Sequence, residues 1–318
     1  MHNKISITVL MPVYNAADYI HDAISSVLVQ TFPSFELLIV NDGSTDDTEK
    51  VINSFHDDRI RLIRQEQKGV AAALNYGIMQ ARGEFIARFD ADDICYPERL
   101  EIQYSFMRTH PEFIIIGSAV DYIDANKQFI FSYYPPALTN QEIQQLPYSI
   151  CPFIHSSVFY RKDVISEIGY NEYAYGFEDH LLWLSAIRLG KVHNLPQPLV
   201  KVRLNPDSVT IDERKRSRKF LTLKYNALKN EAISQIEGLQ LLNELRDQDT
   251  RRIKENAYYS LLAKKYLWNN HNPSKARENI RKAIARNLFD IKGYGLFILS
   301  YLPVNFIVKL HRRLSSSR

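Results

Sequence analysis

Short apolar runs alternate with helically spaced apolar residues over the first ninety positions of the chain. The apolar runs predict strands at residues 5–13, 35–40, 60–63 and 85–89. The helical spacing predicts helices at residues 18–30, through Val51 and Phe55, and at 69–80. Strands and helices in this alternation connect by right-handed crossovers. We therefore predict an α/β fold with a Rossmann-like, mostly parallel sheet, helices on both faces, and a ligand site at the carboxyl edge.

The pattern becomes less regular after residue 93. Helices are predicted at residues 97–107, at 162–168, and from Glu178 through Ile187. Strands are predicted at residues 113–120, 129–133 and 154–160, the first two as an antiparallel flank. This region therefore extends the sheet, and we assign residues 1–211 to one α/β domain.

The last third of the chain predicts an all-helical module, which we assign to residues 212–318. Helices are expected at residues 219–232, 237–245, 258–268 and 275–285. The apolar stretch 294–308 is followed by Lys309, His311, Arg312 and Arg313, and it is shorter than the ~20 residues that span a bilayer. Two alternatives stand: an interfacial anchor on an anionic membrane, or a last core element of the module. The same apolar surface could support a homodimer.

Charge divides the chain in the same way. Residues 1–211 carry 17 Lys and Arg against 26 Asp and Glu, whereas residues 212–318 carry 23 against 10, within a net charge of +4. The basic part is expected to face something anionic, either nucleic acid or a phospholipid surface. The two cysteines, Cys95 and Cys151, and a start without a signal-peptide pattern predict a reducing, cytoplasmic setting.

Three acids follow the fourth predicted strand within four positions, in the tetrad Asp90-Ala91-Asp92-Asp93. Carboxylates gathered at the carboxyl edge of a parallel sheet repel one another unless a cation offsets them. Hard oxygen ligands favour Mg²⁺ or Mn²⁺, which in turn bind substrate phosphates. The alternative is a solvated cap of the next helix.

Several stretches, taken in order, resemble the inverting glycosyltransferases of family 2, which have the GT-A fold. The matching stretches are Val9 to Asn15, Ile39 to Asp46, Lys68-Gly69 to Leu74-Asn75, Ala81-Arg82-Gly83-Glu84, the Asp90 tetrad, His155-Ser156-Ser157 and Gly176-Phe177-Glu178-Asp179. The resemblance covers residues 5–205. It implies a nucleotide-diphosphate sugar donor with uridine as the base, a divalent cation (Mn²⁺ or Mg²⁺), and inversion at the anomeric carbon. It also implies a glycan or lipid-linked saccharide acceptor, bacterial surface-glycan synthesis at the inner face of the membrane, and no nucleic-acid partner.

The resemblance assigns the donor side of the site residue by residue. The nucleotide and sugar would be held by Pro12, Val13, Tyr14, Asn15, Asp42, Lys68, Asp90, Ala91 and Arg203, and the metal by Asp92 and His155. Asp42 could instead cap the following helix, Lys68 could be a solvated surface residue, and His155 could be a core side chain. Asp93 could support the metal ligands from outside or cap a helix. Lys201 and Asn205 replace the aromatic residue and the His that the family carries around Arg203, so a metal-ligand role there is in doubt.

Inverting transfer needs a base for the acceptor hydroxyl, and Asp179 is the candidate, with Glu178 as its neighbour or acceptor anchor. The like charge of Glu178 and partial burial would both raise the pKa of Asp179 toward neutrality. The alternative is that both acids cap their helix, whose N-terminal dipole they complement.

Three rival functions share parts of this pattern. A phosphohydrolase of the haloacid-dehalogenase type carries Asp-x-Asp on its first strand, whereas here the motif follows the fourth strand and precedes Ile94. A nucleotide-sugar pyrophosphorylase would need a Gly-rich loop after the first strand, where this chain has Met11 to Tyr14. A membrane-docked scaffold with a vestigial donor site is the alternative that is not an enzyme.

Overall fold

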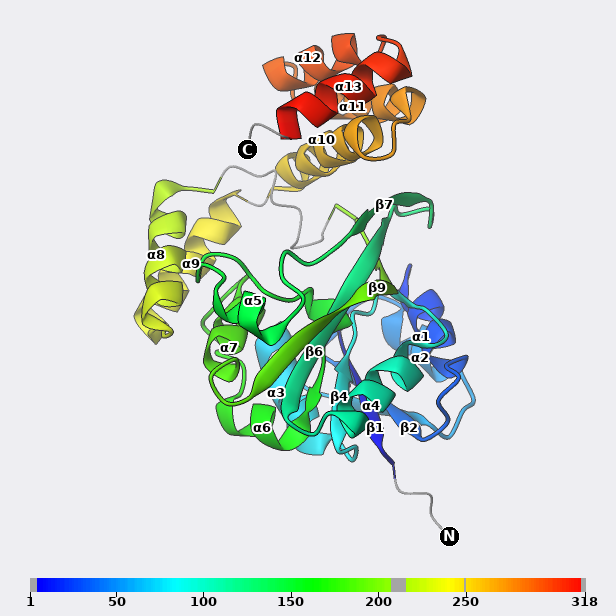
Figure 1. Ribbon diagram of the computed structural model, residues 1–318, viewed down its shortest axis with the longest axis vertical. Coiled ribbons are helices and arrows are strands. Elements are labelled where there is room, and N and C mark those ends of the chain that lie inside the picture. The colour runs from blue at the N-terminus through cyan, green and yellow to red at the C-terminus, as the bar shows by residue number, and fades with distance from the viewer. Residues whose placement is uncertain (1–4, 207–215, 249, 316–318) are drawn as a thin grey trace. The chain divides into compact units, whose positions relative to one another are not determined.

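A computed structural model describes residues 5–206, 216–248 and 250–315, and they form two compact units (Figure 1). The first unit comprises residues 1–121, 133–202 and 222–239, and the second comprises residues 122–132, 203–221 and 240–318. The domain boundary predicted between residues 211 and 212 lies outside the described residues, so it stays a prediction.

The sheet of the first unit begins with four parallel strands. They are β1 (Ile7–Val13), β2 (Phe35–Asn41), β3 (Ile60–Arg64) and β4 (Phe85–Arg88), in the spatial order β3-β2-β1-β4. Every residue of β1, β2 and β4 is buried, as expected of parallel strands covered on both faces. The carboxyl ends of β2 and β4 therefore flank the end of β1, the edge at which the ligand site was predicted.

Antiparallel strands complete the sheet beyond β4. These are β5 (Ile94–Cys95), β6 (Phe113–Ile123), β8 (Phe159–Arg161) and β9 (Lys191–Arg203), in the order β4-β8-β6-β9-β5, and β7 (Phe129–Tyr133) pairs with β6. β8 runs antiparallel to both β4 and β6. The parallel sheet that we predicted is thus present in β1 to β4 and is extended into a mixed sheet.

Two parts of this extension differ from the sequence-based expectation. β9 was not predicted, because Pro196 and Pro198 interrupt its sequence and proline cannot donate to a strand ladder. The strand expected at 154–160 begins as the 3₁₀ turn η1 (His155–Ser157), in which the Ser157 hydroxyl donates to the carbonyl of Ile154 at 2.8 Å. Such a local serine hydrogen bond competes with strand pairing.

Helices cover the sheet of the first unit. They are α1 (Ile20–Leu28), α2 (Thr48–Asn53), α3 (Val70–Gln80), α4 (Arg99–Thr109), α5 (Asn140–Gln144), α6 (Lys162–Ile168) and α7 (Glu178–Ala186). Leu74 of α3, Ile165 of α6 and Trp183 of α7 share one hydrophobic core with Leu10 of β1 and Ile86 of β4. Because side chains alternate along a strand, Arg88 points to the same face of β4 as Ile86. A charged residue thus enters the side of the sheet that α7 covers.

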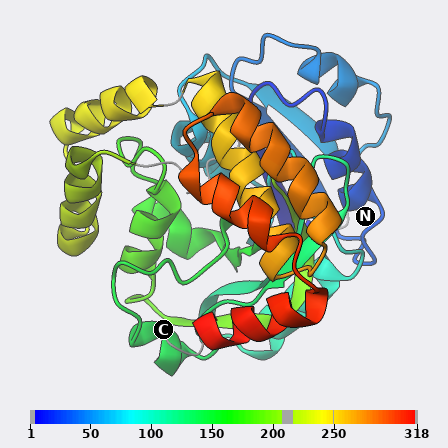
Figure 2. The same ribbon diagram turned by 90° about the horizontal axis from the view of Figure 1, so that it is seen from above.

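Helices α8 (Arg218–Asn230) and α9 (Gln235–Gln248) divide between the two units, and four further helices belong to the second: α10 (Arg251–Trp268), α11 (Pro273–Arg286), α12 (Ile291–Leu299) and α13 (Val304–Ser315). Figure 2 shows α10 and α11 side by side as a helical hairpin. Asn272 caps α11 by accepting from the N–H of Lys275 at 3.1 Å, and Pro273 occupies the first helical position.

In the described part of the chain, no helix combines the length and apolar character needed to cross a membrane.

Candidate functional site

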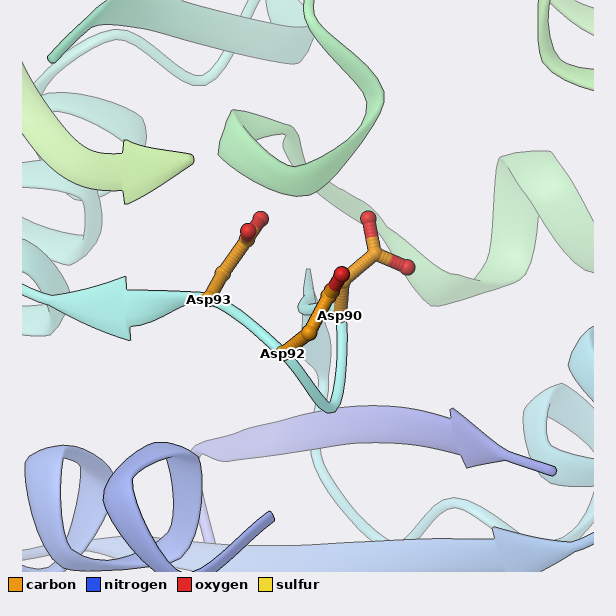
Figure 3. A group of neighbouring side chains, drawn as sticks. All are labelled: Asp90, Asp92 and Asp93. Atoms are coloured by element: carbon orange, nitrogen blue, oxygen red, sulfur yellow. The ribbon is translucent and has the colours of Figure 1, made fainter. Parts of the chain in front are cut away.

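The acidic tetrad occupies the loop between β4 and β5. Figure 3 shows the carboxylates of Asp90, Asp92 and Asp93 projecting to the same side of this loop. One oxygen from each lies within 4.8 Å of the others. Three hard oxygen donors at this spacing fit a divalent cation such as Mg²⁺ or Mn²⁺. The grouping includes Asp93, for which the sequence had offered only a capping or outer role.

Arg88, which sequence analysis did not single out, is a buried cation two residues before the tetrad. Its side chain is 4% exposed, and Nη1 forms an ion pair with Oδ2 of Asp90. Burial raises the pKa values of Glu178 and Asp179, and the positive charge of Arg88 offsets part of this rise. One guanidinium therefore contacts the acidic loop directly and acts electrostatically on Glu178 and on the predicted base Asp179.

His155 connects the same two groups through η1. The hydroxyl of its neighbour Ser156 accepts from the backbone N–H of Asp90 at 3.3 Å, and His155 Nδ1 lies 4.0 Å from Oδ2 of Asp179. Its Nε2 is 2.9 Å from the hydroxyl of Tyr170. Burial, followed by the charge of Arg88, holds the pKa of His155 well below its usual value. The imidazole is therefore neutral at physiological pH, as a metal ligand must be.

Glu178 and Asp179 form the first turn of α7. Asp179 Oδ1 accepts from the N–H of His180 at 2.7 Å, and Glu178 Oε2 accepts from the N–H of Gly176 at 3.1 Å. Burial and then the charge of Asp179 raise the pKa of Glu178 to about 7, and burial raises the pKa of Asp179. The direction predicted for Asp179 is thus confirmed, while the effect of the like charge appears on Glu178. Both acids do contact backbone N–H groups, so capping and proton transfer are compatible.

We expect Glu178→Gln to stabilise the protein at neutral and alkaline pH. The pKa of Glu178 is about 7 in the folded state against 4.5 ordinarily, so the folded state retains a proton between these values and loses stability as pH rises through this window. Gln removes this loss and can still accept from Gly176. The gain in the free energy of unfolding should be near zero at pH 4.5 and about 1–2 kcal/mol above pH 7. This is less than the whole pKa shift would give, because Glu178 is partly exposed to solvent. Urea unfolding of both proteins from pH 4.5 to 8.5 measures it, and a gain independent of pH would contradict this account.

The donor side of the site is built at the ends of β1 and β2. Asp42 is 5% exposed; its Oδ1 accepts from the N–H of Lys68 and its Oδ2 from the N–H of Gly69, each at 2.8 Å. Asn15 has a left-handed backbone, with φ of 49°, and accepts from the N–H of Thr45 at 2.8 Å. Asp42 thus fixes the start of α3, whereas the alternative to nucleotide contact had it cap α2, the helix that follows it directly. Asn15 ties the turn after β2 to the end of β1.

The other predicted donor residues are placed as follows. Pro12 and Val13 are buried and pair with Val40 and Asn41 of β2, whereas Tyr14 is 44% exposed and Lys68 is also exposed. Ala91 is buried within the acidic loop. Arg203 is buried in the second unit, where Nη1 donates to the carbonyl of Ala125 at 3.0 Å. Its role in phosphate binding stays a prediction.

Lys224 of α8 is a second residue that sequence analysis missed, because it follows the stretch that carries the family resemblance. Its Nζ lies 5.6 Å from the ring centre of Phe177, the residue before Glu178. Burial is the largest influence on the pKa of Asp179 and raises it. The hydrogen bond from His180, the charge of Arg88 and then the charge of Lys224 lower it. Asp179 is therefore subject to two positive charges, Arg88 of β4 and Lys224 of α8, and both oppose the rise in its pKa that burial causes.

Comparison with known proteins matches residues 8–169 to the family described as glycosyl transferase family 2. The amylovoran biosynthesis glycosyltransferase AmsE of Erwinia amylovora is 35% identical over 64% of this chain and 77% of its own length. An uncharacterized glycosyltransferase of Rickettsia felis is 30% identical over 83% of this chain, which spans only 44% of that relative. The putative glycosyltransferase EpsE of Bacillus subtilis is 29% identical over 65% of this chain and 76% of its own length.

Solved structures share the fold at low sequence identity. The S. aureus TarS fragment 1–349 in complex with UDP-GlcNAc aligns with a TM-score of 0.56 and 17% identity, covering 97% of this chain and 92% of that one. The mannosyltransferase PcManGT of Pyrobaculum calidifontis, in complex with GDP-Man and Mn²⁺, aligns with a TM-score of 0.53 and 15% identity over 96% and 84%. With the mixed sheet and the acidic loop after β4, these matches establish that the chain is a glycosyltransferase of family 2 with the GT-A fold.

Proposed function

We propose that this protein transfers a sugar, with inversion, from a UDP-sugar to a hydroxyl of a glycan or lipid-linked saccharide during bacterial surface polysaccharide synthesis. The observation that carries the proposal is the position of η1 between the two parts of the site: the Ser156 hydroxyl accepts from the N–H of Asp90 in the acidic loop, and His155 Nδ1 lies 4.0 Å from Oδ2 of Asp179 in α7. An inverting displacement needs these two parts on opposite sides of one sugar ring.

The acidic loop would serve the leaving group. Asp92, with Asp90 and Asp93, would hold Mn²⁺ or Mg²⁺. His155 lies outside this group of ligand atoms, and its neutral imidazole would be a further ligand. A cation in this position supplies positive charge to the departing diphosphate. Arg88 holds the carboxylate of Asp90 in place through its ion pair, so the loop is oriented before the donor binds.

Asp179 would accept the proton of the acceptor hydroxyl as that oxygen attacks the anomeric carbon. Its raised pKa improves it as a proton acceptor near neutrality, and the contact with His180 fixes its carboxylate. Glu178, with a pKa of about 7, is partly protonated at neutral pH and can both accept from and donate to sugar hydroxyls. This division favours Asp179 as the base and Glu178 as an anchor.

The names of relatives support a nucleotide-sugar donor and a role in polysaccharide synthesis. TarS was solved with UDP-GlcNAc, whereas PcManGT was solved with GDP-Man and Mn²⁺. The name of AmsE refers to amylovoran biosynthesis. We accordingly propose a hexosyl or N-acetylhexosaminyl transfer with uridine as the base, at the inner face of the plasma membrane. Family membership argues against the phosphohydrolase and pyrophosphorylase alternatives.

A thermal-shift panel tests the donor proposal. A ligand at a hundredfold excess over its Kd stabilises the folded state by about 2.7 kcal/mol, and a weaker ligand at the same concentration stabilises it less. UDP with Mn²⁺ should therefore raise the melting temperature more than GDP, CDP or dTDP. EDTA should abolish the shift. A larger shift with GDP would overturn uridine, and no shift with any nucleotide would contradict a donor site. Mn²⁺-dependent hydrolysis of the bound UDP-sugar then separates an enzyme from a scaffold.

A further inference from the structure

Large apolar side chains are concentrated on the surface of the last two helices and the segments beside them. Eight exposed large hydrophobic residues lie between positions 288 and 306, and we call them the apolar face: Leu288, Phe289, Ile291, Tyr294, Ile298, Tyr301, Val304 and Phe306. Phe289 is 91% exposed and Ile291 is 84% exposed. Single exposed apolar residues are common, but a group of this kind marks an interaction surface.

The apolar face is not the core-facing side of these helices. Ile291, Tyr294 and Ile298 recur at intervals of three and four residues, which places them on one stripe of α12, and Tyr301 follows three residues later, just beyond the helix. Gly293 and Ser300 are buried between these positions, and Ile307 of α13 is buried further along the chain. Gly293, with the half-buried Leu296 and Phe297, therefore forms the packed side of α12, while Ile291, Tyr294 and Ile298 remain outside. The alternative that this segment is a core element accounts only for the packed side.

Basic residues surround the apolar face. Arg277 lies 4.8 Å from the ring centre of Tyr301, and Arg281 lies 5.7 Å from that of Phe297. Lys292, Lys309, Arg312 and Arg313 add positive charge within the same helices. The acid at position 290 caps α12, since its carboxylate accepts from the N–H of Gly293 at 3.0 Å. The combination of exposed apolar and aromatic groups with a cationic rim is complementary to anionic lipid headgroups above an acyl layer.

A groove of about 460 Å³ opens beside the apolar face, between α10, α11 and α12. Its inner wall includes Ala257, Ile280 and Ala283, and Phe289 and Ile291 of the apolar face also line it. Lys264 and Lys292 are among its polar lining residues. The apolar surface thus continues from the outside of α12 into a hollow between the helices.

We propose that the apolar face docks the enzyme peripherally on the anionic leaflet of a bilayer, with the rings of Phe289, Tyr294 and Tyr301 at the interface. This deepens the proposed function, since a lipid-linked acceptor is presented at such a surface. α12 has nine residues and ends before Pro303, so it lies on the membrane and does not cross it.

Binding of the full-length protein to vesicles tests this inference. We expect sedimentation with phosphatidylcholine vesicles containing 30% phosphatidylglycerol, weak binding to pure phosphatidylcholine, and loss of binding as salt rises. Ile298→Glu should weaken binding at least about tenfold. The matched control is Ile236→Glu on α9, because Ile236 is 71% exposed and Ile298 is 70% exposed. Equal binding by both variants, or no preference for the anionic vesicles, would overturn the inference.

The competing occupant of the apolar face is a second copy of the chain. Light scattering without lipid distinguishes it: a dimer that Ile298→Glu dissociates and Ile236→Glu leaves intact, with no vesicle binding by either, would replace the membrane with a partner subunit. UDP-sugar hydrolysis with Mn²⁺ is measured in solution on the same variants. It should be unchanged in both, so failure of vesicle binding and failure of the donor site are read separately.

Discussion

Asp179→Asn should lower the turnover of sugar transfer by about 10²–10⁴-fold, the usual contribution of a positioned general base. The carboxamide keeps the size of the side chain, and its oxygen can still accept from the N–H of His180, so α7 should begin as before. It cannot take the proton of the acceptor hydroxyl. Single-turnover kinetics with saturating donor and acceptor measure the effect.

Donor binding separates the base from a structural role. The Kd of UDP with Mn²⁺, measured by calorimetry, should change less than about threefold in Asp179→Asn, because the neutral imidazole of His155 and the acidic loop remain. Glu178→Gln should affect the KM for acceptor more than turnover. The assignment would be wrong if Asp179→Asn kept near-normal transfer, or if Glu178→Gln were the more damaging of the two.

Asp92→Asn should lower transfer by about 10²–10³-fold and weaken Mn²⁺ binding, because the cation contributes several kcal/mol of charge stabilisation and one of its three carboxylates is lost. Excess Mn²⁺ should restore part of the activity. The measurement is the apparent Mn²⁺ affinity, by titration of activity and by calorimetry in the presence of UDP.

Asp58→Asn provides the matched control for this prediction, since Asp58 is an exposed acid of the same unit that lies in the loop before β3. It should leave both activity and Mn²⁺ affinity unchanged. If Asp92→Asn bound Mn²⁺ as well as Asp58→Asn does, the acidic loop would not be the metal site. If affinity fell without loss of transfer, the reaction would not depend on the cation.

The parallel half of the fold could be predicted from sequence because its signals are local. The strand runs ending at Val13, Asn41 and Arg88 are predominantly apolar and wholly buried, and each is followed by a turn and a helical repeat. The helices after residue 216 could be predicted because their apolar residues recur every three or four positions. β9 could not be predicted, since Pro196 and Pro198 stand inside it and its stability comes from neighbours that are distant in sequence.

The site could be predicted in part for a similar reason. Asp90, Asp92, Glu178 and Asp179 occur in motifs, whereas Arg88 is one cation inside an apolar run. That it is buried, paired with Asp90 and close to α7 depends on which strands and helices assemble around it. The alternation of Ile86 and Arg88 on β4 was the available signal, because a charge on the buried face of a strand must find a partner.

The most direct test of the central claim is a crystal structure of Asp179→Asn with Mn²⁺ and an unhydrolysed UDP-sugar. The account predicts Mn²⁺ on Asp92, contacting the diphosphate, and the side chain at position 179 facing the anomeric carbon from the side opposite the leaving group. A structure in which the diphosphate avoids the acidic loop, or in which position 179 opens into a cavity that does not contain the sugar, would contradict it.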